Sequence, residues 1–93
     1  MTFEWEARKA EANLKNHRVA FEEASMVFLD PLAMTFPDPD HSSEEIREIT
    51  IGCTIKGRLV FVCHCERKGR IRIISARLAT RTEREQYEEG IGI

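Results

Sequence analysis

This 93-residue chain lacks long apolar segments, an even number of cysteines and a large excess of charge of either sign. Its longest apolar runs, such as residues 59–63, are far too short to cross a bilayer. The N-terminal end is charged and helical in pattern, unlike a signal peptide. These absences argue against membrane and secreted classes of protein and predict a cytoplasmic one. The length predicts one domain over residues 1–93.

The three cysteines, Cys53, Cys63 and Cys65, form neither a CxxC motif nor a Cys/His spacing typical of zinc. They fall in apolar, strand-like segments, and their odd number argues against a secreted disulfide framework. We therefore expect reduced, buried thiols and neither a metal nor a cofactor. Because Cys63 and Cys65 share one face of a strand, a response to oxidation is the alternative.

The net charge is only −2, but the charges are unevenly distributed. Residues 56–84 contain nine basic residues and two acidic ones, Glu66 and Glu83. Residues 1–55 contain eleven acidic and five basic residues, and three further glutamates lie near the C-terminus. This pattern predicts a positive surface within an acidic frame, which suits a phosphate-binding patch.

Hydrophobic periodicity predicts an α+β fold. Apolar residues recur at helical spacing over 6–17 and 21–30, after a short alternating segment at 3–5. Residues 32–36 are predicted to form a strand, and the stretch 37–43, which contains prolines, an exposed loop.

In the second half of the chain the apolar residues alternate, which predicts an antiparallel meander. Its turns are expected at Lys56-Gly57 and at residues 67–69. A last helix, capped by Thr80 or Thr82, is expected to run to Glu89. Two N-terminal helices and a C-terminal helix are thus predicted to pack on a mainly antiparallel sheet.

The sorting of side chains across this meander depends on the lengths of its turns. If both turns contain an even number of residues, the helix-covered face carries Ile51, Val60, Val62, His64, Ile71, Ile73, Ser75 and Arg77. The open face then carries Phe61, Cys63, Cys65, Arg70, Arg72 and Ile74. A β-bulge would overturn this sorting.

One predicted strand carries polar groups where apolar ones are expected, namely Arg70, Arg72, Ser75 and Arg77. Burying guanidinium groups without partners is costly, so these residues indicate either solvated edge positions or a concave surface for an anion. We favour an RNA phosphate as that anion.

A series of short motifs covers almost the whole chain in order: Phe3-Glu4-Trp5, Ala12-Asn13-Leu14, His17, Phe21-Glu22-Glu23-Ala24, Asp30-Pro31, residues 38–42, residues 45–47, Ile51-Gly52, Gly57-Arg58-Leu59, His64 with Arg67, and residues 72–77. Together they resemble the BrnT family. The resemblance implies a RelE-like bacterial ribonuclease that inhibits translation as the toxin of a type II toxin–antitoxin module. It also implies a BrnA-like ribbon-helix-helix antitoxin, which inactivates the toxin in a heterotetramer and contacts operator DNA, so that the complex represses its own operon.

The sequence departs from the family pattern before the second predicted helix. BrnT members commonly carry Lys-His-Gly there, whereas this chain has Lys15, Asn16, His17 and Arg18. Because one helical residue corresponds to a rotation of about 100°, Lys15 points away from the direction of the family lysine.

RNA cleavage without a metal uses the ribose 2′-hydroxyl as nucleophile and needs a base, an acid and cations around the phosphate. The basic half of the chain contains no acidic cluster of the kind that a two-metal nuclease uses. We therefore predict a metal-independent endoribonuclease in which Arg77 and Arg67 clamp the phosphate. Proton transfer is assigned first to His64 and second to His17 with Lys15. The guanidinium and imidazole side chains of the last two predicted strands are expected to converge on one phosphodiester. Further RNA contacts are predicted for Arg70, Arg72, Ser75 and Tyr87.

Each assignment has a structural alternative. His64 can fill a core edge, His17 can be a favourable cation at a helix C-terminus, and Arg77 can pair with Glu83. Solvation or packing alone can account for Arg70, Arg72, Ser75 and Tyr87. The alternative function is a non-catalytic α+β binding module, or an attenuated toxin, that acts through its basic face.

Overall fold

The computed structural model describes residues 1–39 and 46–90, so that residues 40–43 of the predicted loop lie outside the described part. The elements, in chain order, are β1 (Phe3–Glu4), α1 (Ala7–His17), α2 (Phe21–Ala24), the 3₁₀ helix η1 (Ser25–Leu29), β2 (Met34–Pro37), β3 (Arg47–Cys53), β4 (Leu59–Arg67), β5 (Arg70–Leu78) and α3 (Arg81–Glu89). This confirms the predicted α+β class. The second predicted helix is divided into α2 and η1.

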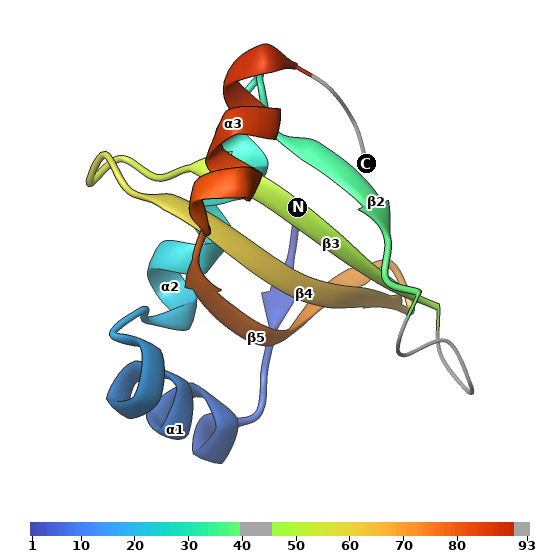
Figure 1. Ribbon diagram of the computed structural model, residues 1–93. Helices are drawn as coiled ribbons and strands as arrows, with labels where there is room; N and C mark the ends of the chain where they lie inside the picture. Colours follow the sequence, from blue (N-terminus) through green and yellow to red (C-terminus); the bar gives the residue numbers. More distant parts are fainter. Residues whose placement is uncertain (40–45, 91–93) are drawn as a thin grey trace.

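The strands form one sheet in the order β1-β5-β4-β3-β2. Strand β1 runs parallel to β5 and pairs Phe3 with Ile71 and Glu4 with Arg72, whereas the other neighbouring strands are antiparallel. Figure 1 shows α1 and α2 on one side of this sheet and α3 on the other. Within residues 1–39 and 46–90, no helix is long and apolar enough to span a membrane.

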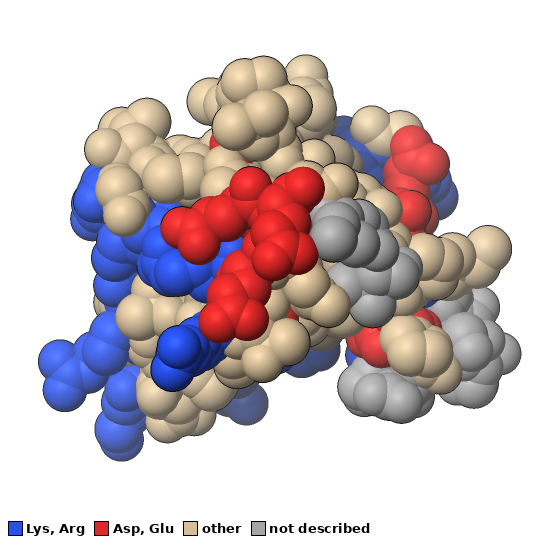
Figure 2. All heavy atoms as spheres, turned by 45° about the horizontal axis from the view of Figure 1, so that its top comes forward, with Lys and Arg blue, Asp and Glu red and all other residues tan. Residues whose placement is uncertain are grey.

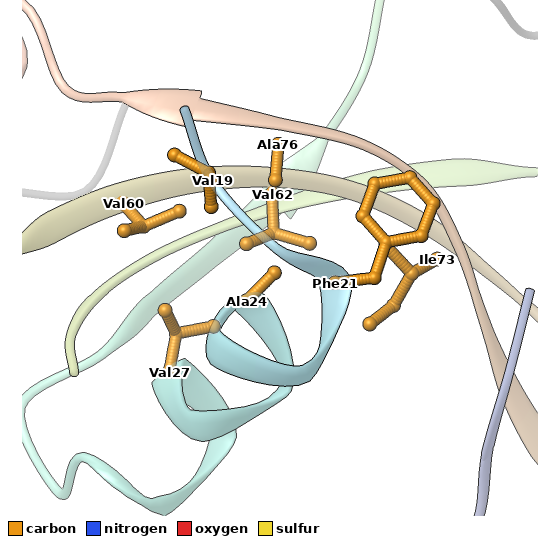
Figure 3. Packing of buried hydrophobic residues seen from close by; sticks show 8 residues of the cluster. All are labelled: Val19, Phe21, Ala24, Val27, Val60, Val62, Ile73 and Ala76. Atoms are coloured by element: carbon orange, nitrogen blue, oxygen red, sulfur yellow. The ribbon is translucent and has the colours of Figure 1, made fainter. Parts of the chain in front are cut away.

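The main core lies on the face of the sheet covered by α1 and α2, here called the helix face. Figure 3 shows its eight buried residues: Val19, Phe21, Ala24, Val27, Val60, Val62, Ile73 and Ala76. Aromatic contacts attach the N-terminal strand to this core. The rings of Phe3 and Phe28 have centroids 5.3 Å apart, and Trp5 packs edge-on against Phe21 at 5.9 Å. Full burial of such a side chain is worth about 1.5–3 kcal/mol, and the partly buried Phe3 and Trp5 each contribute a share of this amount to holding β1.

Asn13, buried on α1, continues the sheet where β1 ends. Its Nδ2 donates hydrogen bonds to the carbonyl oxygens of Ala76 (2.8 Å) and Val19 (2.9 Å), and its Oδ1 accepts one from the Ala76 N–H (3.0 Å). The pairing of β1 with β5 stops at Arg72. The Asn13 amide therefore pairs with backbone groups of β5 that would otherwise form an open edge, and it fixes α1 against the sheet.

The opposite side of the sheet, here called the arginine face, carries five arginine side chains: Arg47 of β3 and Arg67, Arg70, Arg72 and Arg77 of β4 and β5. Helix α3 covers one end of this face and packs on a smaller apolar cluster: Ile49, Ile51, Leu59, Phe36, Phe61, Ala79 and Tyr87. A capping box starts α3, as predicted from Thr80. The Glu83 N–H donates to Thr80 Oγ1 (3.2 Å), and the Thr80 N–H donates to Glu83 Oε1 (2.8 Å).

The predicted sorting is wrong at Ile51, because the loop between β3 and β4 has five residues, 54–58, instead of an even number. This odd length places Ile51 on the arginine face, next to Phe61. The same loop region leaves Cys53 exposed, which corrects its predicted burial, whereas Cys63 and Cys65 are buried free thiols as expected.

The sorting is also wrong at Ser75 and Arg77, because β5 contains a β-bulge. Cys63 pairs with Ser75 but the next residue of β4, His64, pairs with Ile73, so that Ile74 is left without a partner in β4. The extra residue inverts the alternation of side chains beyond it. Ser75 and Arg77 consequently lie on the arginine face, while His64 stays on the helix face.

Candidate active site

The tip of the β4–β5 hairpin concentrates positive charge. Its two turn residues, Lys68 and Gly69, both have positive φ angles (51° and 78°), as in the type I′ turns that match the twist of a hairpin. Arg67 and Arg70 therefore stand directly opposite each other. Like charges in this position destabilise a β-pair, so the arrangement suits an anionic ligand better than it suits folding.

Glu4 lies beside this tip and completes a hollow in the surface. The hollow, here called the hairpin hollow, is lined by Glu4, Arg67, Lys68 and Arg70. Arg72 Nη1 donates to Glu4 Oε2 at 2.9 Å, and Arg70 Nη1 lies 3.8 Å from Glu4 Oε1. The Arg70 side chain is 62% exposed and that of Arg72 only 27%. Among the described residues, the hollow thus combines three exposed cations with one carboxylate.

Arg77, predicted to clamp phosphate, is engaged by α3. Its Nη1 and Nη2 donate to Glu83 Oε1 and Oε2 at 2.8 and 2.9 Å, and its guanidinium carbon lies 3.8 Å from the centroid of the Phe61 ring. Burial opposes ionisation of Glu83, but hydrogen bonds from Arg77 and Thr80 outweigh this effect and lower its pKa. The structure therefore shows the alternative, in which Arg77 pairs with Glu83.

Tyr87 holds the other end of α3. Its hydroxyl donates to Asp30 Oδ2 at 2.5 Å, and Asp30 also accepts hydrogen bonds from the N–H groups of Leu32 and Cys53. Burial and the bond to Asp30 raise the pKa of Tyr87 to about 12.

Figure 2 shows acidic side chains gathered over α3, beside a group of basic ones. Ser75 is exposed on the arginine face.

His64 lies in the interior of the helix face. The residue is 5% exposed, its Nε2 is hydrogen-bonded to Thr50 Oγ1 at 2.7 Å, and its ring packs edge-on against Phe28 with centroids 4.9 Å apart. Burial lowers the pKa of His64 to about 4, so the imidazole is neutral at pH 7. Because the sheet separates His64 from Arg77, the predicted convergence of these two groups is wrong.

Lys15 and His17 are exposed in the last turn of α1, far from the hairpin hollow. The next residue, Arg18, has a left-handed φ of 60°, and its carbonyl accepts a hydrogen bond from Arg58 Nη2 at 2.9 Å. Arg58 also forms an ion pair with the buried Glu23 and thereby lowers the pKa of that carboxyl. Strand β4 begins directly after Arg58 and ends directly before the hairpin tip. At about 3.3 Å per residue, the two ends of this nine-residue strand lie roughly 27 Å apart. The structure does not bring Lys15 and His17 to the hairpin hollow.

Comparisons with known proteins agree with this architecture. The family model described as "Ribonuclease toxin, BrnT, of type II toxin-antitoxin system" matches residues 5–83. The chain belongs to the BrnT family. The 1.1 Å crystal structure of the Brucella abortus ribonuclease toxin BrnT covers 87% of this chain and 99% of its own, with a TM-score of 0.69 and 20% sequence identity, and so shares the fold. No curated protein matches the chain. The BrnT resemblance stated from the motifs is confirmed, and the family implies an antitoxin partner.

The sequence alone did not point to Glu4 or Lys68 as residues of the hairpin hollow in this BrnT-family chain. The alternation of Phe3, Glu4 and Trp5 was a usable signal, because two aromatic anchors direct the intervening carboxylate to the opposite face. The missing information was that β1 lies parallel to β5, since a parallel pairing of distant segments leaves no local mark in the sequence.

Proposed function

We propose that this protein is an endoribonuclease that cleaves RNA without a metal, in the hairpin hollow. The observation that carries the proposal is the gathering of Arg67, Lys68 and Arg70 around Glu4. Guanidinium groups bind phosphate oxygens through paired hydrogen bonds, and cations stabilise the additional negative charge of a pentacoordinate phosphorus. Within residues 1–39 and 46–90, one carboxylate lines the hollow, whereas a two-metal nuclease uses several.

In this proposal the residues predicted from sequence take separate roles. Arg67 and Arg70 bind the scissile phosphate, and the exposed Ser75 lies on the same face, where the RNA backbone can continue. Arg72 acts through its ion pair with Glu4. We assign no contact with the reacting phosphate to His64, Arg77 or Tyr87, because other parts of the fold engage these side chains. We also assign none to Lys15 and His17, because the fold places them away from the hairpin hollow.

The antitoxin partner that the family implies is proposed to be a BrnA-like ribbon-helix-helix protein. A segment of acidic and apolar residues would complement the cations of the hairpin hollow and block access of RNA. The DNA-binding half of the antitoxin would carry the complex to its operator, so that a heterotetramer represses its own operon. After its release in the cytoplasm, the toxin would cleave RNA and thereby inhibit translation.

The test is cleavage of RNA by the purified protein in the presence of EDTA. We expect products with 2′,3′-cyclic phosphate and 5′-hydroxyl ends, and we expect an excess of the antitoxin to stop the reaction. Cleavage that requires added Mg²⁺ and leaves 3′-hydroxyl ends would contradict the metal-free mechanism. RNA binding without cleavage would instead support the non-catalytic alternative.

A further inference from the structure

We infer that Glu4 is the general base of this reaction, the group that removes the proton of the ribose 2′-hydroxyl. The inference rests on the proposed ribonuclease function and identifies the proton acceptor within it. Cleavage through the 2′-hydroxyl requires an acceptor within hydrogen-bond reach of the nucleophile, next to the cations that bind the phosphate. In the part of the chain that the structure describes, Glu4 is the carboxylate that lines the hairpin hollow together with Arg67, Lys68 and Arg70.

The fold fixes the position of Glu4 from both sides along the chain. Phe3 packs on Phe28 and Trp5 packs on Phe21, both on the helix face. Because side chains alternate along a strand, two anchors on the helix face direct Glu4 to the arginine face. The register of β1 with β5 then places Glu4 next to Arg72.

The two neighbouring arginines are held differently, which suggests different roles. Arg72 binds Glu4 Oε2 at 2.9 Å and is mostly covered, so it orients the carboxylate. Arg70 lies 3.8 Å from Glu4 Oε1, beyond hydrogen-bond distance, and its side chain is 62% exposed. Arg70 can therefore turn to an incoming phosphate and leave Oε1 available for the 2′-hydroxyl.

The two histidines among residues 1–39 and 46–90 do not supply this base. His64 is buried behind the sheet, hydrogen-bonded to Thr50, and His17 lies at the end of α1 beside the opposite end of β4. Glu4 thus performs, in this chain, the proton transfer that the sequence alone assigned to imidazole groups.

The step is balanced as follows. Glu4 Oε1 takes the proton of the 2′-hydroxyl while the 2′-oxygen forms a bond to phosphorus, and the bond between phosphorus and the 5′-oxygen breaks. The departing 5′-oxygen takes a proton from water, which leaves a 5′-hydroxyl and a 2′,3′-cyclic phosphate. The Glu4 proton then passes to the resulting hydroxide. Arg67, Lys68 and Arg70 offset the negative charge on the phosphoryl oxygens during this exchange.

The experiment compares Glu4→Gln with Glu66→Gln as a matched control. Glu66 is an exposed glutamate of β4 near the same hairpin, and it pairs with Ile71 on the helix-face side. We expect Glu4→Gln to lower kcat by about 10²–10⁴-fold, the range for loss of a general base, and Glu66→Gln to leave kcat unchanged. RNA with a 2′-deoxy group at the cleaved position should bind Glu4→Gln at least as tightly as the native protein, because a negative charge is removed.

The pH dependence distinguishes a base from a merely structural residue. In the native protein kcat/KM should fall on the acidic side as a carboxylate is protonated, and this fall should be absent from the residual activity of Glu4→Gln. Glu4→Asp, which keeps a carboxylate, should retain more activity than Glu4→Gln, and it decides the matter if Glu4→Gln does not fold.

Full activity of a folded Glu4→Gln protein, or an unchanged acidic limb in its pH profile, would overturn the role of Glu4 while leaving the ribonuclease function intact. Equal losses in Glu4→Gln and Glu4→Asp, accompanied by a matching loss of affinity for the 2′-deoxy RNA, would also overturn it. If the native protein itself does not cleave RNA, the proposed function fails, and that result is separate from both outcomes.

Discussion

His64 on the helix face and the hairpin tip on the arginine face provide opposite environments for ionisable side chains. On the helix face His64 is enclosed by Thr50 and Phe28 and is kept neutral by burial. On the arginine face the cations of the hairpin tip remain open to solvent around Glu4. A face that excludes water stabilises the fold, whereas a face that leaves charges solvated can bind a charged ligand. This difference is the reason why we propose the arginine face as the place of the chemistry.

The largest effect that we expect from the difference between the faces is the loss of folding stability at acidic pH caused by His64. Its pKa is about 4 in the folded protein and about 6.5 when unfolded, so between these values the unfolded state binds more protons. The stabilisation is complete above about pH 6.5 and is lost as the pH falls through 4, a change of up to about 3 kcal/mol.

Urea denaturation at several pH values measures this loss. Native protein should lose more stability between pH 7 and 4 than His64→Gln, whereas His17→Gln should match the native protein because His17 is exposed. The carboxylates with lowered pKa, Glu23, Asp30 and Glu83, lose stabilisation at acidic pH in all three proteins and cancel in the comparison. The same acid slope in native protein and His64→Gln would show that His64 is not enclosed.

A smaller effect is expected where α1 meets the edge of β5. Asn13→Ala removes the hydrogen bonds to Ala76 and Val19 and leaves buried backbone groups unpaired, which should cost about 2–3 kcal/mol of unfolding free energy. Asn16→Ala, at an exposed position of the same helix, should change stability by less than about 0.5 kcal/mol. Equal costs in urea denaturation would mean that the Asn13 side chain does not extend the sheet.

The smallest effect is expected on the arginine face. Glu83→Gln weakens the ion pair with Arg77 and should lower the unfolding free energy by only about 1 kcal/mol, because Arg77 is partly exposed and the ion pair is screened by solvent. RNA cleavage should stay within about twofold of native, since α3 does not line the hairpin hollow. A large loss of RNA cleavage by a folded Glu83→Gln protein would instead indicate that Arg77 and α3 take part in the active site.

The sequence was sufficient for the elements and for the family, because helical spacing, alternation and the Thr80 cap are local signals. It was insufficient for the site, because the site depends on register. One bulged residue, Ile74, moved Arg77 to the opposite face from His64, and a five-residue loop did the same for Ile51. Burial of His64 and the pairing of Glu4 with Arg72 depend on contacts between distant segments, which local periodicity does not contain.

The most direct test of the central claim compares RNA cleavage rates of two double variants with verified folds. Arg67→Ala with Arg70→Ala removes two cations of the hairpin hollow, and Lys15→Ala with His17→Ala removes the basic groups in the last turn of α1. We predict a loss of at least about 100-fold for the first variant and a change of no more than about threefold for the second. An active hairpin variant together with an inactive α1 variant would contradict the account.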